Sequence, residues 1–354
     1  MKRIVLTGGG TAGHVTPNIA LLPRLREADF EIFYIGSHDG IEKKLIQSQN
    51  IPYYGISSGK LRRYFDLKNF TDPFRVIKGF SEASSLMKQL KPDVVFSKGG
   101  FVSVPVVMAA KRHHIPVICH ESDLTPGLAN KLSMPSATKV CCNFPETLQY
   151  LPKGKAVLTG CPIRKELMEG SRTAALTMTG FTPDKPVLMV MGGSLGAVAV
   201  NQAVRNALPE LLEHWQIVHL CGKGKTDESL NGTKGYVQYE YIHKELADLF
   251  ALCDIVVSRA GANAICELLA LRKPTLLIPL SAKASRGDQI LNARSFERQG
   301  FSMVLEEEKI TKNTFLDAVS ELAAHRQDYI KTMEDCPQSD AIDTILGLIR
   351  ETTI

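Results

Sequence analysis

The sequence lacks several patterns that would place it in large classes of protein. No apolar run approaches the roughly 20 residues that a membrane-spanning helix needs. The N-terminus enters a strand-like segment at once, which is not the pattern of a secretory signal. The eight cysteines contain no Cys-x-x-Cys spacing, and only Cys141 and Cys142 are adjacent. We therefore expect reduced thiols rather than a disulfide framework or a zinc site.

Several catalytic and nucleic-acid-binding motifs are incomplete. His120-Glu121 lacks the second histidine of a zinc protease, because Leu124 occupies its place. Residues 222–226 resemble the end of a P-loop, but His219 stands where the leading glycine should be. There is no Asp-x-Asp pair, no zinc finger and no RNA-recognition signature. These absences argue against a metalloprotease, an ATPase and a nucleic-acid partner, and we expect no metal.

The length of the chain and its uneven charge distribution indicate how it is organised. A chain of 354 residues is longer than the chains that usually form a single hydrophobic core, so we expect two domains. Residues 1–160 carry 21 Lys and Arg against 12 Asp and Glu, whereas the remainder carries 21 against 25. We infer that the basic first half meets something anionic, and a membrane surface or a diphosphate ligand fits better than nucleic acid.

Short apolar runs alternate with amphipathic segments along the whole chain, which predicts an α/β protein with two doubly wound, Rossmann-like domains facing a cleft. We expect strands at residues 4–6, 32–35, 94–96, 117–120, 140–142, 187–191, 217–220, 255–257 and 275–278. We expect helices at residues 18–27, 41–48, 74–90, 104–113, 197–212, 244–252, 262–271, 289–299 and from 312 onward. The predicted divisions are 1–161, 162–335 and a C-terminal helix at 336–354 that returns to the first domain.

Two glycine-rich loops each follow an apolar strand and open into a helix, at residues 8–13 and 192–196. Such a loop can bring backbone N–H groups and a positive helix end against an anion. The first loop satisfies the dinucleotide-binding pattern, but the acid expected at the end of the second strand is missing, because Asp39 comes too late. We therefore disfavour NAD as the ligand of this loop. A third glycine turn, at residues 99–105, suggests a second anion cradle beside the first.

The ordered set of motifs resembles the MurG-type glycosyltransferases and covers nearly the whole chain. The matching segments are residues 9–17, 99–105, 120–131, 160–164, 192–197, 258–267 and 288–293. The resemblance implies the two-domain type B glycosyltransferase fold, with no cofactor and no metal motif. It also implies inverting transfer of N-acetylglucosamine from its UDP form to the 4-hydroxyl of an undecaprenyl-diphosphate-linked muramyl-pentapeptide, at the cytoplasmic face of a bacterial membrane.

The resemblance assigns donor binding mainly to the second domain, where the glycine loop would hold the nucleotide phosphates and Glu267 the ribose hydroxyls. The donor-binding residues that it implies are Thr11, His14, Asp123, Arg164, Ser194, Ile242, Glu267, Asp288 and Gln289. Two of them depart from the family pattern, because Asp123 and Asp288 stand where the family has amides. A carboxylate can accept a hydrogen bond from a sugar hydroxyl but cannot donate one as an amide does.

The acceptor and the catalytic base are expected in the first domain. Gly10, Gly13, Gly99 and Gly100 would cradle the acceptor's diphosphate. His14 and Glu121 are rival bases for the acceptor hydroxyl. A nearby positive helix end would lower the pKa of His14 and favour the neutral imidazole that a base requires. An alternative role for His14 is only to orient the loop.

Aromatic and basic residues near positions 61–88 indicate contact with an anionic membrane surface, through Tyr64, Phe65, Phe74 and Phe80. The alternative is that these aromatic residues belong to the core. Other functions also stay open: a glycolipid glycosyltransferase or a UDP-N-acetylglucosamine 2-epimerase of the same fold, or a non-catalytic protein that binds UDP-sugars.

Overall fold

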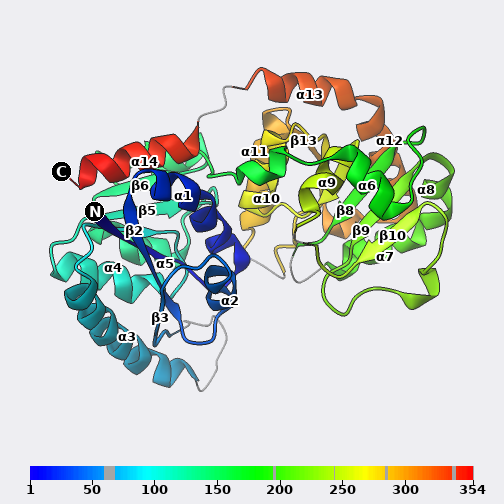
Figure 1. Cartoon of the computed structure of the whole chain (residues 1–354). Coiled ribbons are helices and arrows are strands. Elements are labelled where there is room, and N and C mark those ends of the chain that lie inside the picture. Colours follow the sequence, from blue (N-terminus) through cyan, green and yellow to red (C-terminus); the bar gives the residue numbers. More distant parts are fainter. Residues whose placement is uncertain (60–67, 194–196, 243, 284–285, 337–339, 354) are drawn as a thin grey trace. The chain divides into compact units, whose positions relative to one another are not determined.

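The computed structural model describes residues 1–59, 68–193, 197–242, 244–283, 286–336 and 340–353. The chain divides into two compact units. Unit 1 comprises Met1–Arg164 together with Ser339–Ile354, and unit 2 comprises Lys165–Gln338. Each unit is a parallel sheet with helices on both faces (Figure 1).

The sheet of unit 1 has seven parallel strands in the order β3-β2-β1-β4-β5-β6-β7. They are β1 (Lys2–Thr7), β2 (Phe30–Ser37), β3 (Tyr53–Ile56), β4 (Val94–Ser97), β5 (Val117–Glu121), β6 (Lys139–Cys142) and β7 (Ala156–Leu158). The strand order reverses direction between β1 and β4. In such sheets, ligands bind outside the carboxyl ends of the strands at this reversal.

Helices cover both faces of this sheet. They are α1 (Thr16–Glu27), α2 (Ile41–Gln47), α3 (Lys68–Leu90), α4 (Ser103–Arg112), α5 (Leu128–Ser133) and α14 (Ala341–Thr352), with 3-10 turns η1 (Ala12–His14), η2 (Met134–Ser136) and η3 (Pro145–Tyr150). Alternate residues of β1 face opposite layers: Ile4 and Leu6 pack in one core with α1 and α14, and Val5 packs in the other with α3 and α4. Because both faces are buried, the central strands are almost continuously apolar.

The sheet of unit 2 has six parallel strands in the order β10-β9-β8-β11-β12-β13, and its direction reverses between β8 and β11. The strands are β8 (Val187–Met191), β9 (Gln216–Leu220), β10 (Tyr236–Tyr239), β11 (Ile255–Ser258), β12 (Thr275–Leu277) and β13 (Ser302–Val304). The carboxyl ends of β8 and β11 therefore mark the expected ligand side of this unit.

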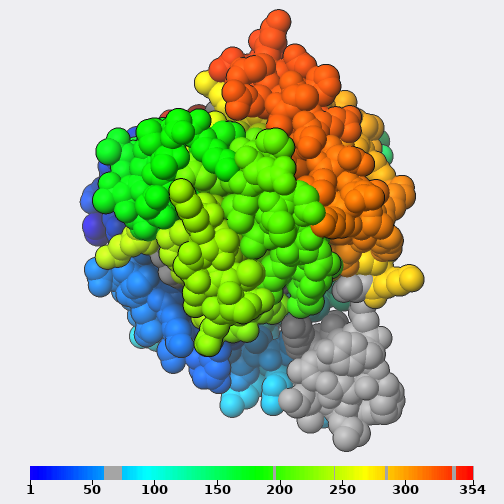
Figure 2. Space-filling model, turned by 90° about the vertical axis from the view of Figure 1, so that its right-hand side faces the viewer, coloured from blue at the N-terminus to red at the C-terminus, as the bar shows by residue number. Residues whose placement is uncertain are grey.

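The helices of unit 2 are α6 (Arg172–Thr179), α7 (Val198–Asn206), α8 (Leu208–His214), α9 (Leu246–Leu252), α10 (Ala262–Ala270), α11 (Asp288–Arg298), α12 (Lys312–Ala324) and α13 (Arg326–Glu334). The 3-10 turns are η4 (Lys165–Met168), η5 (Glu228–Leu230) and η6 (Glu307–Lys309). The orange helices α12 and α13 form a ridge on the surface of this unit (Figure 2). Met333 is the residue that α13 buries, and it contributes to a small pocket under α10.

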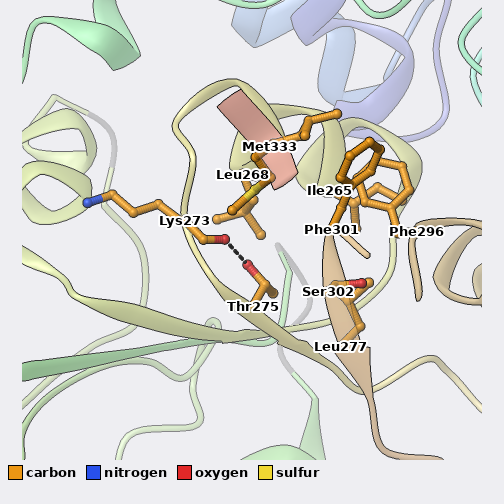
Figure 3. Close-up of a pocket in the computed structure, with 10 residues that line it drawn as sticks. Ile265, Leu268, Lys273, Thr275, Leu277, Phe296, Phe301, Ser302 and Met333 are labelled. Carbon is orange, nitrogen blue, oxygen red and sulfur yellow. Dashed lines mark hydrogen bonds between the residues drawn. The ribbon is translucent and has the colours of Figure 1, made fainter. Parts of the chain in front are cut away.

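That pocket is apolar and lies within the packing of unit 2 (Figure 3). Its lining includes Leu268, Phe296 and Phe301. Lys273 is the lining residue with a charged side chain, and its Nζ donates to the carbonyl of Cys253 at 2.8 Å. We attribute the pocket to imperfect packing of helices on the sheet rather than to ligand binding.

The structure confirms the α/β class and all nine strands expected from the sequence. The expected helix at 197–212 is wrong, because α7 ends at Asn206 and α8 starts at Leu208. Pro209 lies in the first turn of α8, where its missing N–H is tolerated, whereas inside one continuous helix it would remove a hydrogen bond. No disulfide joins any two of the eight cysteines.

Candidate functional site

Two of the glycine turns of unit 1 meet where its strand order reverses. Thr7 and Ser97 are neighbours at the ends of β1 and β4. The N–H of Gly9 donates to the carbonyl of Gly99 at 3.3 Å, which joins the two loops. A Cβ on Gly100 would lie 2.3 Å from the carbonyl oxygen of Gly9. Gly100 also has a φ of +86°, so both space and backbone conformation require glycine there.

A buried carboxylate accepts hydrogen bonds from the first glycine loop and its neighbours. Glu42, at the start of α2, is fully buried and accepts hydrogen bonds from the N–H of Gly10 at 3.2 Å and from Ser37. The Ser37 N–H and hydroxyl lie 3.0 and 2.6 Å from its Oε1. The amides of Gly9 and Gly10 are thus used inside the protein.

His14 ends the short turn η1 that follows the loop. Its Nδ1 lies 2.9 Å from the carbonyl of Gly9 and 3.3 Å from Oγ1 of Thr11. Donation from Nδ1–H to that carbonyl makes Nε2 the proton-accepting nitrogen of the neutral ring. Burial, and then the positive charge of Lys98, lower the pKa of His14 below its ordinary value. The pKa of His14 is therefore lowered, as the sequence predicts, but burial and Lys98 lower it rather than a helix end.

Lys98 and His120 form a buried polar pair beneath the loops. Nζ of Lys98 donates to Nδ1 of His120 at 2.7 Å and contacts Oγ of Ser122. Nε2 of His120 then donates to the carbonyl of Gly160 at 3.0 Å. Burial and the charge of Lys98 hold the pKa of His120 well below its ordinary value, so this ring is neutral.

Glu121 organises the segment that follows β5. Its Oε1 accepts from the N–H of Asp123 at 3.0 Å. Its Oε2 accepts from the N–H of Gly127 and from Nδ2 of Asn130, each at 2.9 Å. Burial, and then the nearby Asp123, raise the pKa of Glu121 above its ordinary value. Since both oxygens already hold their own segment in place, the geometry favours His14 over Glu121 as the base.

The candidate residues of unit 2 follow its strands in the same way. Gly193 follows β8 with a φ of +82°. Glu267 lies half-buried within α10, the helix that starts after the loop following β11. Ile242 is half-buried after β10 and packs against the core of this unit. Ser194 lies outside the described residues.

The first turn of α11 carries two further candidates. Asp288 is held by Arg286, whose Nε lies 2.6 Å from Oδ2 of the carboxylate. Oε1 of Gln289 accepts from the N–H of Leu280 at 3.0 Å, which leaves its amide nitrogen as the donor for a ligand. Arg164 is the last residue of the first segment of unit 1 and is half-buried. The contacts of Asp288 and Gln289 show that part of each of these two side chains is used to fix the segment before α11.

The expected membrane-facing residues have different surroundings. Phe74 is 75% exposed and Ile77 is 66% exposed on α3, with Arg75 and Lys78 between and beside them. Phe80 is half-buried and packs against the core of unit 1. Tyr64 and Phe65 lie outside the described residues. Among the described helices, none is both long and apolar enough to cross a membrane.

The structure thus brings one set of predicted residues together at the carboxyl end of the unit 1 sheet. This set is Gly10, Thr11, Gly13, His14, Gly99, Gly100, Glu121 and Asp123. Lys98 and Glu42 belong to the same cluster and are missed by the sequence analysis. Lys98 could have been found by asking which side chain follows the second central strand. Within the described part of the chain, no group of three or more His, Cys, Asp or Glu is arranged to hold a metal ion.

Comparison with known proteins identifies the family. Residues 4–142 match the glycosyltransferase family 28 N-terminal domain, and residues 187–345 match the glycosyltransferase family 28 C-terminal domain. A UDP-N-acetylglucosamine--N-acetylmuramyl-(pentapeptide) pyrophosphoryl-undecaprenol N-acetylglucosamine transferase from Lachnospira eligens is 68% identical over 353 residues, a match that covers 100% of each chain.

Solved structures agree with this match. The crystal structure of Acinetobacter baumannii MurG superimposes with a TM-score of 0.77 at 26% identity, covering 99% of this chain and 100% of that one. A UDP-GlcNAc 2-epimerase from Methanocaldococcus jannaschii has a TM-score of 0.67 at 13% identity, covering 99% and 100%, which shows a shared fold alone. The chain therefore belongs to glycosyltransferase family 28 and, within it, to the family of UDP-N-acetylglucosamine–N-acetylmuramyl-(pentapeptide) pyrophosphoryl-undecaprenol N-acetylglucosamine transferases.

Proposed function

We propose that this protein transfers N-acetylglucosamine from UDP-N-acetylglucosamine to the 4-hydroxyl of the muramic acid in undecaprenyl-diphosphate-linked muramyl-pentapeptide. The product is the lipid-linked disaccharide precursor of peptidoglycan, and UDP leaves. The observation that carries the proposal is the 68% identity to a relative of that name over the whole of both chains. The acceptor oxygen attacks the anomeric carbon from the side opposite UDP, so the configuration inverts.

His14 is the group that takes the proton from the acceptor hydroxyl. Its Nδ1 is fixed by the carbonyl of Gly9, so Nε2 carries the lone pair. The lowered pKa keeps the ring neutral at physiological pH, which is the form that can accept a proton. Glu121 holds the segment after β5 in shape.

The acceptor's diphosphate binds at the joined glycine loops of unit 1. The amides of Gly9 and Gly10 are engaged by Gly99 and Glu42, so these residues shape the loop and do not contact the phosphates through N–H. The amides at the start of η1, together with Gly13 and the turn at Gly99 and Gly100, are the groups that we assign to the diphosphate.

The donor binds at the carboxyl ends of the unit 2 strands. Gly193 and Ser194 take the nucleotide phosphates, Glu267 takes the ribose hydroxyls and the backbone of Ile242 contacts the uracil. The sugar is held by Asp288 and Gln289, whose donor is its amide nitrogen because Oε1 is already used. We assign further donor contacts to four residues of unit 1: Thr11, His14, Asp123 and Arg164.

The protein attaches peripherally to the cytoplasmic face of the membrane, where its lipid-linked acceptor resides. The exposed Phe74 and Ile77 beside Arg75 and Lys78 supply apolar contact and positive charge on one helix.

One assay separates this function from its alternatives. Labelled UDP-N-acetylglucosamine is incubated with a soluble muramyl-pentapeptide diphosphate-lipid analogue, with diacylglycerol, or with no acceptor. We expect label on the muramyl acceptor alone. Transfer to diacylglycerol would indicate a glycolipid enzyme, and epimerised UDP-sugar without acceptor would indicate an epimerase. Donor binding with no turnover in any of the three would indicate a non-catalytic protein.

A further inference from the structure

A buried chain of hydrogen bonds joins the carboxyl ends of β4, β5 and β7 in unit 1. Nζ of Lys98, the first residue after β4, donates to Nδ1 of His120 at 2.7 Å. Nε2 of His120, on β5, donates to the carbonyl of Gly160 at 3.0 Å. Lys98 and His120 are 1% and 0% exposed. Three strands that lie apart in the sequence are thus connected at the edge of the sheet where ligands are expected.

The lysine determines in which direction the histidine ring can donate. An ammonium group has three donors and no acceptor, so Nδ1 of His120 must accept. A protonated ring has two N–H donors and could not accept, so the ring is neutral and carries its proton on Nε2. The carbonyl of Gly160 is the acceptor that this tautomer requires.

Gly160 is held on both its N–H and its carbonyl side. The N–H groups of Thr159 and Gly160 both donate to the carbonyl of Cys142, the last residue of β6, at 3.1 Å. The carbonyl of Gly160 accepts from His120 and, at 3.0 Å, from the hydroxyl of Thr159. Gly160 has a φ of +75°, a backbone conformation that favours glycine. The chain is therefore fixed at this residue, directly after β7.

The segment that follows Gly160 leads to a residue that we assign to the donor. Residues 160–164, all of which the structure describes, contain no helix or strand. Cys161 is 8% exposed, Pro162 is buried, and Arg164 is the last residue of the first segment of unit 1. A proline fixes its own φ. The course of this short segment thus depends on how Gly160 is held.

We propose that His120 is a positioning residue for donor binding, which fixes the carbonyl of Gly160 and thereby the course of the segment that carries Arg164 to the donor. Lys98 contributes by holding His120 in the tautomer that can donate. The inference rests on the proposed function, in which Arg164 contacts the donor. His120 touches no substrate in this role, because it is fully buried and both ring nitrogens are used within unit 1.

Two substitutions of His120 separate its two hydrogen bonds. The side-chain nitrogen of glutamine reaches about as far as Nε2, so His120→Gln keeps a donor for Gly160. The side-chain oxygen of asparagine reaches about as far as Nδ1, so His120→Asn keeps an acceptor for Lys98 but loses the donor.

The KM values for the two substrates are the readout, with the soluble muramyl-pentapeptide diphosphate-lipid analogue as acceptor. His120→Asn should raise the KM for UDP-N-acetylglucosamine about tenfold and the KM for the acceptor by less than about twofold. His120→Gln should raise the donor KM by less than about threefold. Equal increases in the two variants, or an unchanged donor KM in His120→Asn, would overturn the proposal.

His113→Asn is the matched control. Nε2 of this half-buried histidine lies 2.7 Å from Oγ of Ser84, and breaking that contact leaves the hydrogen bonds of Gly160 in place. The donor KM should therefore equal that of the unmodified protein. A rise as large as that of His120→Asn would show that the effect does not depend on Gly160, and the proposal would fall.

A double-mutant cycle tests whether His120 acts through Arg164. Arg164→Met should raise the donor KM, and adding His120→Asn should raise it further by less than about twofold, because the positioned residue is already gone. A further increase of about tenfold would overturn the proposal, since His120 would then act independently of Arg164.

A measurement on the unmodified protein does not depend on the folding of a variant. NMR chemical shifts of the ring nitrogens of His120 should place its proton on Nε2, and a proton on Nδ1 would overturn the proposal. If His120→Asn does not fold, Thr159→Val replaces it, because it removes the other donor to the Gly160 carbonyl. The donor KM should then rise about threefold, and an unchanged donor KM would contradict the inference.

The two proposals fail in different ways. If no transfer to the muramyl acceptor occurs, the proposed function fails. If transfer occurs but Arg164→Met leaves the donor KM unchanged, the assignment of Arg164 to the donor fails, and the role of His120 falls with it. If Arg164→Met raises the donor KM but His120→Asn does not, the donor assignment stands and only the role of His120 falls.

Discussion

The candidate sites of the two units are built in different ways. In unit 1 the polar groups are buried and hold one another, as Lys98 holds His120 and as Glu42 holds the first glycine loop. In unit 2 the candidates are half-buried side chains at helix starts or within helices, such as Glu267 and Gln289. This difference indicates that the buried polar groups of unit 1 fix the loop conformation, and their own protonation, in the absence of a ligand. Except at His120, substitutions there should change turnover or stability, whereas those in unit 2 should change affinity.

The largest effect is expected at His14. His14→Ala should reduce turnover by about 10²- to 10⁴-fold, because it removes the base, while the affinity for UDP stays the same. Steady-state kinetics with the soluble acceptor and calorimetry with UDP would measure the two quantities. Near-normal turnover would show that His14 is not the base. It would also weaken the contrast between a unit 1 that controls turnover and a unit 2 that controls affinity.

Glu42 tests whether unit 1 depends on buried carboxylates. Glu42→Ala removes a fully buried acceptor from the Gly10 N–H and from two donors of Ser37. We expect the free energy of unfolding of unit 1 to fall by about 2–4 kcal/mol. Hydrogen exchange of the β1 and β2 amides measures this loss. Glu31→Ala is the control, since this acid forms a half-exposed pair with Arg3 and should cost about 0–1 kcal/mol. Equal protection in the two variants would contradict the supporting role of Glu42.

Glu267 tests the opposite side of the comparison. Glu267→Ala should weaken UDP binding about 10- to 100-fold, because two hydroxyl contacts to a carboxylate are lost, and it should leave stability nearly unchanged. Calorimetry measures the affinity. Glu297→Ala on α11, an acid paired with Arg294, is the matched control and should bind UDP normally. Unchanged affinity in Glu267→Ala would reassign the ribose contact.

Acid should destabilise unit 2 through a buried histidine. Burial lowers the pKa of His219 to about 3, and its nitrogens contact Tyr236 and Asn201. Unfolding lets the ring bind a proton below about pH 6.5, so stability falls by up to about 1.4 kcal/mol per pH unit from there toward pH 3. Trp215, the single tryptophan, reports unfolding of this unit. His219→Gln should flatten this dependence, and an unchanged slope would exclude His219 as its source.

The smallest effect is expected at the exposed surface of α3. Replacing Phe74 and Ile77 together by serine should reduce binding to anionic vesicles about tenfold and leave transfer to the soluble acceptor unchanged. Tyr150→Ser, which alters another exposed aromatic residue of unit 1, is the control and should bind normally. Equal binding to anionic and neutral vesicles would argue against the contribution of Arg75 and Lys78.

The sequence predicted the central strands better than the edges of the sheets. β1, β4, β8 and β11 are apolar runs because they are buried on both faces. The outermost strands β3, β7, β10 and β13 were not predicted, because an edge strand has one neighbour and tolerates polar residues such as Gln238. Their pairing depends on tertiary context rather than on local pattern.

The candidate site was predictable to the same degree. The glycine loops and His14 stand next to predicted strands, so their motif placed them correctly at one end of the unit 1 sheet. Glu42 gave no local signal, since a single acid at the start of a short helix is normally exposed to solvent. Its role follows from the crossing of α2 beneath the loop, which the sequence does not encode locally.

The helix α14 has a consequence for how the chain folds. Ile345 and Ile349 lie in the same core as Leu21 and Leu25 of α1, and Arg24 pairs with Asp343 at 2.6 Å. During synthesis, the part of this core that α14 covers thus stays exposed until all of unit 2 has been made. We expect a ribosome-bound chain to finish unit 2 before unit 1, so that chaperones protect the first-made half for longer than the second.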